Sequence, residues 1–219
     1  MKKKHFIDIT KIAVGALMLV TALYTYIPYA RYMYQLTFII NMAGAALFIT
    51  DGIIGIAKNK SIPDILYLMH AVAISFVFLI TEAATVLGMA NFNLDDGAMV
   101  FLHIINPVIV ISFYLSSGSK ATFNIKNVLI SPMFFLAYLV FDYIRFLFKH
   151  HFVYGLFSKD NMTLAKAVII GSAVYIAAGV LGFIFHMIRC RFRFRKKTGG
   201  RTSFEAIEAL ENIEPIAIN

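Results

Sequence analysis

Charged residues and cysteine are both scarce in this chain. Only 15% of the 219 residues are charged and 60% are hydrophobic, whereas a soluble domain has about a quarter charged and about half apolar residues. The single cysteine, Cys190, excludes an intrachain disulfide and a cysteine metal cluster. No Arg/Lys cluster is interleaved with aromatic residues on a polar surface, which argues against nucleic acid as a partner. The composition therefore predicts a membrane domain without a soluble one.

The apolar residues form six long runs, each near the length of about 20 residues that a spanning helix needs. Polar or proline-containing breaks separate them, for example at residues 58–63 and 116–120. The first run follows three lysines but is not closed by a small-residue cleavage site, so it is interpreted as an uncleaved span. We expect an all-α bundle of six transmembrane helices, near residues 10–29, 33–57, 64–89, 97–115, 127–148 and 163–188.

The distribution of Lys and Arg predicts how this bundle is oriented. With a cytoplasmic N-terminus, fifteen of these residues fall on the cytoplasmic side and five on the other. This asymmetry follows the positive-inside rule and predicts a multi-pass protein of the cell membrane with both termini in the cytoplasm. The five residues assigned to the outer side are Arg31, Arg145, Lys149, Lys159 and Lys166.

Two regions follow from this plan: a transmembrane domain at residues 1–189 and a cytoplasmic tail at 190–219. The tail begins with a basic stretch, which is attracted to anionic lipid head groups. Thr202-x-x-Glu205 then resembles a capping box. A short acidic amphipathic helix that ends before Pro215 is expected, and it either docks on the basic stretch, binds a protein partner or frays.

Polar residues inside the predicted spans are the most informative signal for function. Ionisable groups are costly there, and they usually face the bundle interior or water. Spacings of three or four residues put Thr37 with Asn41, and His103 with Asn106, on shared helix faces. If the faces point inward, they line a polar chamber that opens toward the outer leaflet. The polar residues of this outer half include Thr37, Asn41, Glu82, His103, Asn106, Tyr138, Asp142 and Arg145.

Thr37 and His103 are a candidate nucleophile and base at similar depth. A hydroxyl needs an adjacent base to become a useful nucleophile, and imidazole titrates in the right range. Asn41, Asn106 or Glu82 are candidates for orienting the imidazole or stabilising an oxyanion. The structural alternative is that the Thr37 hydroxyl bonds back to a carbonyl one turn earlier and that His103 only pairs with Glu82.

The remaining polar residues have plain structural interpretations. Asp142 and Arg145 fit an ion pair near the level of the head groups, with Tyr138 in the same cluster. Asp51 and His70 are expected to meet in the inner half, as a helix-packing hydrogen bond or as a proton relay. No set of residues has the spacing of metal ligands, and the expected chemistry needs no cofactor.

Three segments carry a resemblance to a known family. They are Leu36-Thr-Phe-Ile39, Phe101-Leu-His-Ile-Ile-Asn-Pro107, and Pro132-x5-Tyr138 with the aromatic and His-rich stretch 149–157 that follows. Together with the six-span plan, they make most of residues 10–188 resemble the androgen-induced/FAR-type family of membrane proteins and its bacterial relatives.

This resemblance implies a specific chemistry. Characterised animal members of the family are intramembrane hydrolases that cleave esters of fatty acids with hydroxy fatty acids, and they use a membrane Thr and a membrane His. The matching residues are Thr37 and His103, which implies a lipid ester as substrate. Two other classes stay open: a small transporter or channel subunit with a polar path, and a non-catalytic membrane scaffold whose tail recruits a partner.

Overall fold

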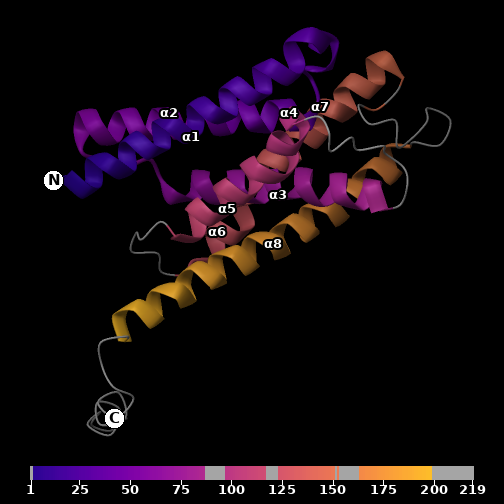
Figure 1. The fold of residues 1–219 in the computed structure, drawn as a ribbon. Coiled ribbons are helices and arrows are strands. Elements are labelled where there is room, and N and C mark those ends of the chain that lie inside the picture. The colour runs from indigo at the N-terminus through magenta and orange to yellow at the C-terminus, as the bar shows by residue number, and fades with distance from the viewer. Residues whose placement is uncertain (1, 87–96, 117–122, 151, 153–162, 199–219) are drawn as a thin grey trace, which may run out of the picture.

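The computed structural model describes residues 2–86, 97–116, 123–150, 152 and 163–198, and every regular element within them is helical (Figure 1). The amphipathic helix expected after Thr202 lies outside the described residues, as does Lys159. The elements are α1 (Lys2–Tyr26), η1 (Ile27–Tyr32), α2 (Leu36–Lys58), α3 (Asp64–Val86), α4 (Gly97–Val100), η2 (Phe101–Ile105), α5 (Asn106–Ser116), α6 (Ile125–Ile130), α7 (Met133–Lys149) and α8 (Leu164–Thr198).

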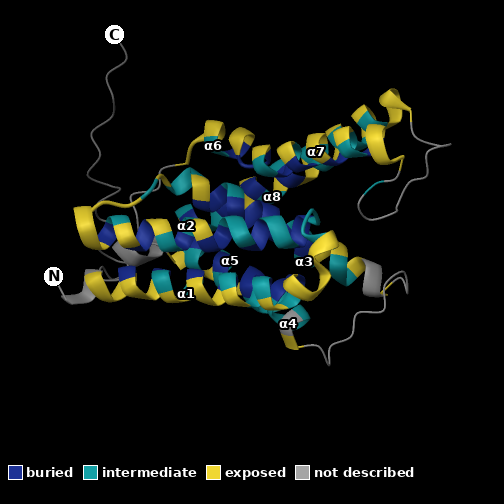
Figure 2. Ribbon diagram, turned by 90° about the horizontal axis from the view of Figure 1, so that it is seen from above, coloured by how far each residue is buried: buried dark blue, intermediate teal, exposed yellow. Residues whose placement is uncertain are grey.

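Five helical stretches are long and apolar enough to cross a membrane, as the sequence predicted for those regions. They are His5–Tyr32, Leu36–Lys58, Asp64–Ala83, Ile125–Lys149 and Leu164–Arg191. The region predicted as the fourth span consists of α4, η2 and α5 in succession, and its apolar helix, Phe101–Ser116, is shorter. The outward faces of α1 and α7 are largely exposed (Figure 2) and carry large apolar side chains such as Val20 and Phe148. Such a surface suits contact with lipid.

Two helix boundaries differ from the sequence-based expectation. Within the stretch Ile125–Lys149, α6 and α7 are separated by a turn at Ser131 and Pro132, where both residues keep right-handed helical backbone angles. Proline lacks the amide proton that a continuous helix needs, so the hydrogen-bond ladder is interrupted there. At the other end of the chain, α8 continues to Thr198, ten residues beyond its predicted end.

Helix α3 is central, and it lies between the α1–α2 pair and α8 (Figure 1). All five residues from 71 to 75 are buried. The rings of Phe48 (α2), Tyr67 (α3) and Phe113 (α5) pack against one another with centroids 5.0 to 5.4 Å apart. The middle of the bundle is therefore a tightly filled apolar and aromatic core.

Helices α1 and α2 lie side by side over most of their length (Figure 1), and glycines allow this close approach. A Cβ atom at Gly15 would lie 2.8 Å from the Ala45 carbonyl oxygen and 2.9 Å from the Ile49 nitrogen. Small residues at such interfaces let helix backbones approach when the surroundings supply little hydrophobic drive. The polar side chains of α1 thereby come within hydrogen-bonding distance of α2 and its neighbours.

Asp51 is the centre of a buried charged cluster at the end of α2. Its side chain accepts hydrogen bonds from the Tyr67 hydroxyl at 2.7 Å and the Ile62 amide at 2.8 Å, and its carboxylate is 2.8 Å from the Lys11 ammonium. The Ser61 hydroxyl also donates to it at 2.8 Å, and Lys11 is 3.1 Å from Asp8 as well. The cluster joins α1, α2 and α3 by charge-assisted bonds.

The expected contact between Asp51 and His70 is absent. Tyr67 lies one turn before His70 on α3, and with Lys11 it occupies the Asp51 carboxylate. His70 is instead buried against Gly44, where a Cβ atom would collide with its imidazole. The Nε2 atom of His70 has no hydrogen-bond partner among the described residues.

Candidate active site

Thr37 is the second residue of α2. Gln35 precedes the helix in an extended conformation with φ −67° and ψ 145°, and its side chain does not cap the helix. The first α-helical bond of this turn runs from the Ile39 amide to the Gln35 carbonyl at 3.1 Å. The amides of the three preceding residues consequently have no acceptor within the helix. The Thr37 side chain thus lies next to main-chain N–H groups at the positive end of a helix dipole.

His103 is held in the π-helical turn η2, between α4 and α5. Proline at position 107 cannot donate to the His103 carbonyl four residues earlier, and its ring would crowd that carbonyl in a regular α-helix. The turn widens instead, and the Asn106 amide bonds to the Phe101 carbonyl five residues back. Such single π turns are frequent at functional sites. The apolar pattern of residues 97–115 predicted an ordinary helix here, although Pro107, four residues after His103, signals the irregular turn.

The structure brings Thr37 and His103 together. Thr37 Oγ1 and His103 Nε2 are 3.3 Å apart, and both residues are buried, with 4% and 5% of their surface exposed. His103 Nδ1 is 3.0 Å from the Met99 carbonyl oxygen. Since a carbonyl only accepts, Nδ1 carries the proton in the neutral ring, and the lone pair of Nε2 faces the threonine hydroxyl. This is the arrangement of a base beside a nucleophile, at a separation common in structures without substrate.

Two fully buried asparagines support this pair. The Asn41 amide donates to the Thr37 carbonyl at 2.8 Å and to the Leu102 carbonyl at 3.4 Å. The Asn106 amide donates to Asn41 Oδ1 at 2.7 Å and to the Thr21 hydroxyl at 3.3 Å. Each side chain has only two N–H donors, so both are fully used in this conformation. The asparagines are placed to orient α2 against η2, and neither has a donor left for an oxyanion.

Thr21 of α1 joins the network, and sequence reasoning missed it. Its hydroxyl donates to the Leu17 carbonyl at 2.9 Å and accepts from Asn106 at 3.3 Å. A hydroxyl that bonds back within its own helix is common in apolar helices, so nothing in the local sequence distinguishes Thr21 from Thr25. Its role depends on the close α1–α2 packing.

The polar residues of α7 lie elsewhere than in the predicted shared chamber. The Tyr138 hydroxyl donates to the Tyr34 carbonyl at 3.4 Å, and the Arg145 guanidinium lies 4.0 Å from the centroid of the Tyr34 ring. Asp142 is buried on the same face of α7. Tyr138 and Arg145 attach α7 to Tyr34, which lies three residues before Thr37.

Glu82 of α3 is only partly buried, and among the described residues no hydrogen bond joins it to His103. An apolar cluster borders the candidate site instead. It contains Ala22, Tyr26 and Leu102, with Tyr32, Met33, Phe38 and Met42 packed against it. The Tyr26 hydroxyl also donates to the Gln35 side chain at 2.9 Å. The Thr37–His103 pair is therefore buried beside this cluster in this conformation.

Within the described part of the chain, no three His, Cys, Asp or Glu side chains come close enough to hold a metal ion. The site is therefore built from a hydroxyl, an imidazole, two carboxamides and main-chain amides. No protein-family model, curated protein or solved structure matches this chain, so the family resemblance stays a prediction that rests on its short motifs.

Proposed function

We propose that this protein is an intramembrane hydrolase of lipid esters in which Thr37 is the nucleophile and His103 the base. The observation that carries the proposal is the 3.3 Å contact between the Thr37 hydroxyl and His103 Nε2, with Nδ1 oriented by the Met99 carbonyl. A nucleophile, a base and a group that orients the base are the three parts of hydroxyl-dependent acyl transfer.

The reaction proceeds in two acyl-transfer steps. Thr37 Oγ1 attacks the ester carbonyl carbon while His103 Nε2 takes the hydroxyl proton. Collapse of the tetrahedral intermediate breaks the bond to the alcohol, which leaves with the proton from Nε2, and the acyl group stays on Thr37. Water then attacks the acyl group, His103 accepts its proton and returns it to Thr37 Oγ1, and the fatty acid is released.

Main-chain amides are the proposed oxyanion donors. The first turn of α2 has N–H groups at Leu36, Thr37 and Phe38 that lack helical acceptors. Donors fixed next to the nucleophile stabilise negative charge as it develops on the carbonyl oxygen. The asparagine side chains cannot supply this contact here, because their donors bind Thr37, Leu102, Asn41 and Thr21.

The test is ester turnover by the purified protein in lipid nanodiscs, with a short p-nitrophenyl ester and a branched fatty-acid ester as substrates. Release of the alcohol above the rate of empty nanodiscs is the expected result. Absence of turnover on both substrates would shift the assignment to one of the non-hydrolytic classes.

A specific observation disfavours the transporter alternative. A transport path needs polar groups at every depth, whereas the buried residues of α2 between Asn41 and Asp51 are Gly44, Ala45 and Phe48. The Phe48 ring packs on Tyr67 and Phe113, and His70 of α3 is the polar side chain buried against Gly44. The scaffold alternative depends on the tail after Thr198, which lies outside the described residues.

Asn106 is the proposed positioning residue, and its replacement tests that role. In Asn106→Leu, the Asn41 carboxamide oxygen loses its donor, and the α2–η2 alignment relaxes. A misplacement of about 1 Å costs about 10²-fold in rate, so kcat is expected to fall by roughly that factor with KM little changed. The matched control is Asn127→Leu, because Asn127 is a partly buried asparagine of α6. Wild-type kcat in Asn106→Leu would show that the asparagine network does not position the catalytic pair.

We further propose that the chain crosses the cell membrane six times, with both termini in the cytoplasm. Two ion pairs support an even number of crossings. Lys11, near the start of the chain, binds Asp51, and Arg189, near its end, binds Asp64. Asp51 and Asp64 lie on either side of the α2–α3 connection, so both ends of the chain are at the same end of the bundle. The region 97–116 runs from His103, beside Thr37, to Tyr114, whose hydroxyl is 3.2 Å from His186 near Arg189. That course supports a sixth crossing.

Cysteine labelling tests the orientation in a Cys190→Ser background. A membrane-impermeant maleimide added to intact cells is expected to label Lys149→Cys and not Lys58→Cys, since the positive-inside rule puts Lys58 in the cytoplasm. Both native lysines are exposed, so each introduced cysteine reports its compartment. The reverse pattern would invert the orientation, and labelling at both positions would contradict a single topology.

A further inference from the structure

One imidazole joins three helical segments at the end of α8 that carries Arg189. His186 of α8 is buried, with 3% of its surface exposed. Its Nε2 atom is 3.1 Å from the main-chain nitrogen of Asn124, the residue that precedes α6, and its Nδ1 atom is 3.2 Å from the hydroxyl oxygen of Tyr114 in α5. The centroid of its ring is 5.4 Å from that of the Phe123 ring. The proposed reaction makes no use of this residue.

These partners require the neutral form of the His186 ring. A main-chain amide only donates, so Nε2 has to present its lone pair to Asn124. The proton of the neutral ring is then on Nδ1, which donates to the Tyr114 oxygen. An imidazolium carries a proton on both nitrogens, and its Nε2–H would face the Asn124 N–H across 3.1 Å. Protonation therefore breaks the contact with Asn124 and keeps the contact with Tyr114.

The charged groups around the imidazole do not compensate for this loss. Within the described residues, the ionisable groups that the surrounding helices carry at this end of the bundle are Arg189, Cys190 and Arg191 of α8, Asp64 and Tyr67 of α3, Tyr114 of α5 and Lys126 of α6. Asp64 is the carboxylate in this set, and it is 3.0 Å from the Arg189 guanidinium, so its charge is already paired. The Asp64 side chain is 43% exposed, so water reaches this end of the bundle and can deliver a proton.

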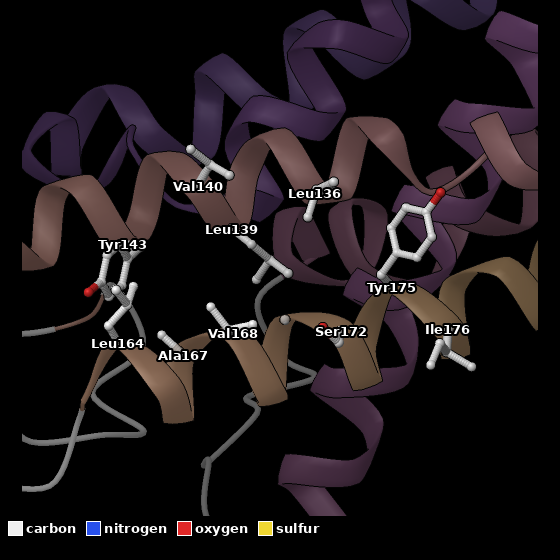
Figure 3. Close-up of a pocket in the computed structure, with 11 residues that line it drawn as sticks. Leu136, Leu139, Val140, Tyr143, Leu164, Ala167, Val168, Ser172, Tyr175 and Ile176 are labelled. Carbon is white, nitrogen blue, oxygen red and sulfur yellow. The ribbon is translucent and has the colours of Figure 1, made fainter.

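The two ends of α6 are attached to α8 by different bonds. At its start, the Asn124 side chain caps the helix by accepting from the Lys126 amide at 2.9 Å, while the Asn124 amide donates to His186. Near its other end, the Leu129 carbonyl accepts from the Tyr175 hydroxyl at 2.7 Å, and Figure 3 shows the Tyr175 side chain extending from α8. That second bond joins a hydroxyl to a carbonyl and does not involve an imidazole. Loss of the first bond thus frees only the start of α6.

We propose that His186 is a pH-sensitive switch in the attachment of α6. With the imidazole neutral, α5 and α6 are both bound to α8. With the imidazole protonated, α5 stays bound, and the start of α6 is released together with Phe123. The attachment is therefore present at high pH and is lost as the pH falls. In the proposed orientation this end of the bundle is cytoplasmic, so the switch responds to cytoplasmic acidification, and it does not depend on the proposed hydrolysis.

Hydrogen–deuterium exchange of the purified protein in nanodiscs tests the switch. Amides exchange through local opening, so their protection, corrected for the intrinsic pH dependence of exchange, reports how firmly each segment is attached. The comparison is made at about pH 7.5 and about pH 5.5, on either side of the ordinary titration of imidazole near 6.5. In wild type, the protection of residues 123–130 is expected to fall roughly tenfold at the lower pH, the factor that corresponds to one hydrogen bond. Residues 106–116 of α5 are expected to keep their protection.

His186→Gln separates this imidazole from every other titrating group. The glutamine side chain offers the Asn124 amide an oxygen that does not take up a proton in this range, so the protection of residues 123–130 is expected to be the same at both pH values. His5→Gln is the matched control, because His5 is an exposed imidazole of α1, and this variant is expected to lose protection as wild type does.

Equal protection of residues 123–130 at both pH values in wild type would overturn the proposal, and so would the same fall in His186→Gln. If His186→Gln does not give monodisperse protein, the pattern in wild type decides. A loss confined to residues 123–130 supports release of α6, whereas an equal loss in α5 would mean general unfolding in acid and would overturn the switch.

Discussion

Thr37→Ala is expected to reduce ester turnover in nanodiscs by about 10³-fold or more, because it removes the atom to which the acyl group is transferred. His103→Gln is expected to reduce kcat by about 10²- to 10⁴-fold, the usual contribution of a general base. Thr37→Ser keeps a hydroxyl at the same position and should retain most of the activity. The measurement is the release of alcohol and fatty acid under saturating substrate, with each variant compared at equal protein concentration.

The double variant gives this prediction its sharpest form. Residues that act as one catalytic unit are strongly non-additive, so the Thr37→Ala/His103→Gln double variant should lose no more activity than Thr37→Ala alone. Independent, additive losses would indicate that the two residues act separately, in which case the 3.3 Å contact is a structural hydrogen bond.

Thr10→Ala is the matched control for the threonine substitution. Thr10 is exposed in α1, and its hydroxyl donates to the Phe6 carbonyl at 2.8 Å, the ordinary back-bond of a helical threonine. Its loss should leave turnover unchanged. Turnover that survives in both Thr37→Ala and His103→Gln would exclude the proposed mechanism, provided that both variants elute as monodisperse protein.

Two features of the sequence pointed to the contact between Thr37 and His103. Both residues were assigned a similar depth, in the second and the fourth predicted span, and the family resemblance pointed to the same two positions. The spacing of Thr37 and Asn41 also predicted one shared helix face, and Asn41 does bond to the Thr37 carbonyl at 2.8 Å. Periodicity along one helix and depth across helices are therefore informative when the chain has few polar residues in its spans.

The parts that sequence reasoning missed depend on how the helices are rotated against one another. Depth alone grouped Glu82 and the polar residues of α7 with Thr37 and His103, but Tyr138 and Arg145 contact Tyr34. Thr21 entered the network because glycines bring α1 against α2. The π turn at His103 arises because Pro107 cannot donate to the His103 carbonyl four residues earlier. This effect is local in sequence and was therefore predictable in principle.

Asp51→Asn is expected to destabilise the protein by about 3 kcal/mol, near the lower end of the effect of removing one partner of a buried ion pair. The substitution leaves the Lys11 ammonium, only 9% exposed, without the carboxylate at 2.8 Å, although Asp8 remains 3.1 Å away. It also weakens the acceptor for Tyr67, which ties α3 to α2. The measurement is the thermal unfolding midpoint in detergent.

The size of that effect distinguishes a buried cluster from a surface one. Lys58→Gln changes the charge at the same end of α2, but Lys58 is exposed, and exposed substitutions usually alter stability by less than about 0.5 kcal/mol. A fall in the midpoint for Asp51→Asn with none for Lys58→Gln is therefore expected. An equally small change in both would mean that water reaches the cluster and screens Lys11, because only a desolvated ammonium is strongly destabilised by the loss of its partner. The Asp51 cluster would then act as an exposed interfacial network at the end of the bundle, and the dry core would begin at Phe48.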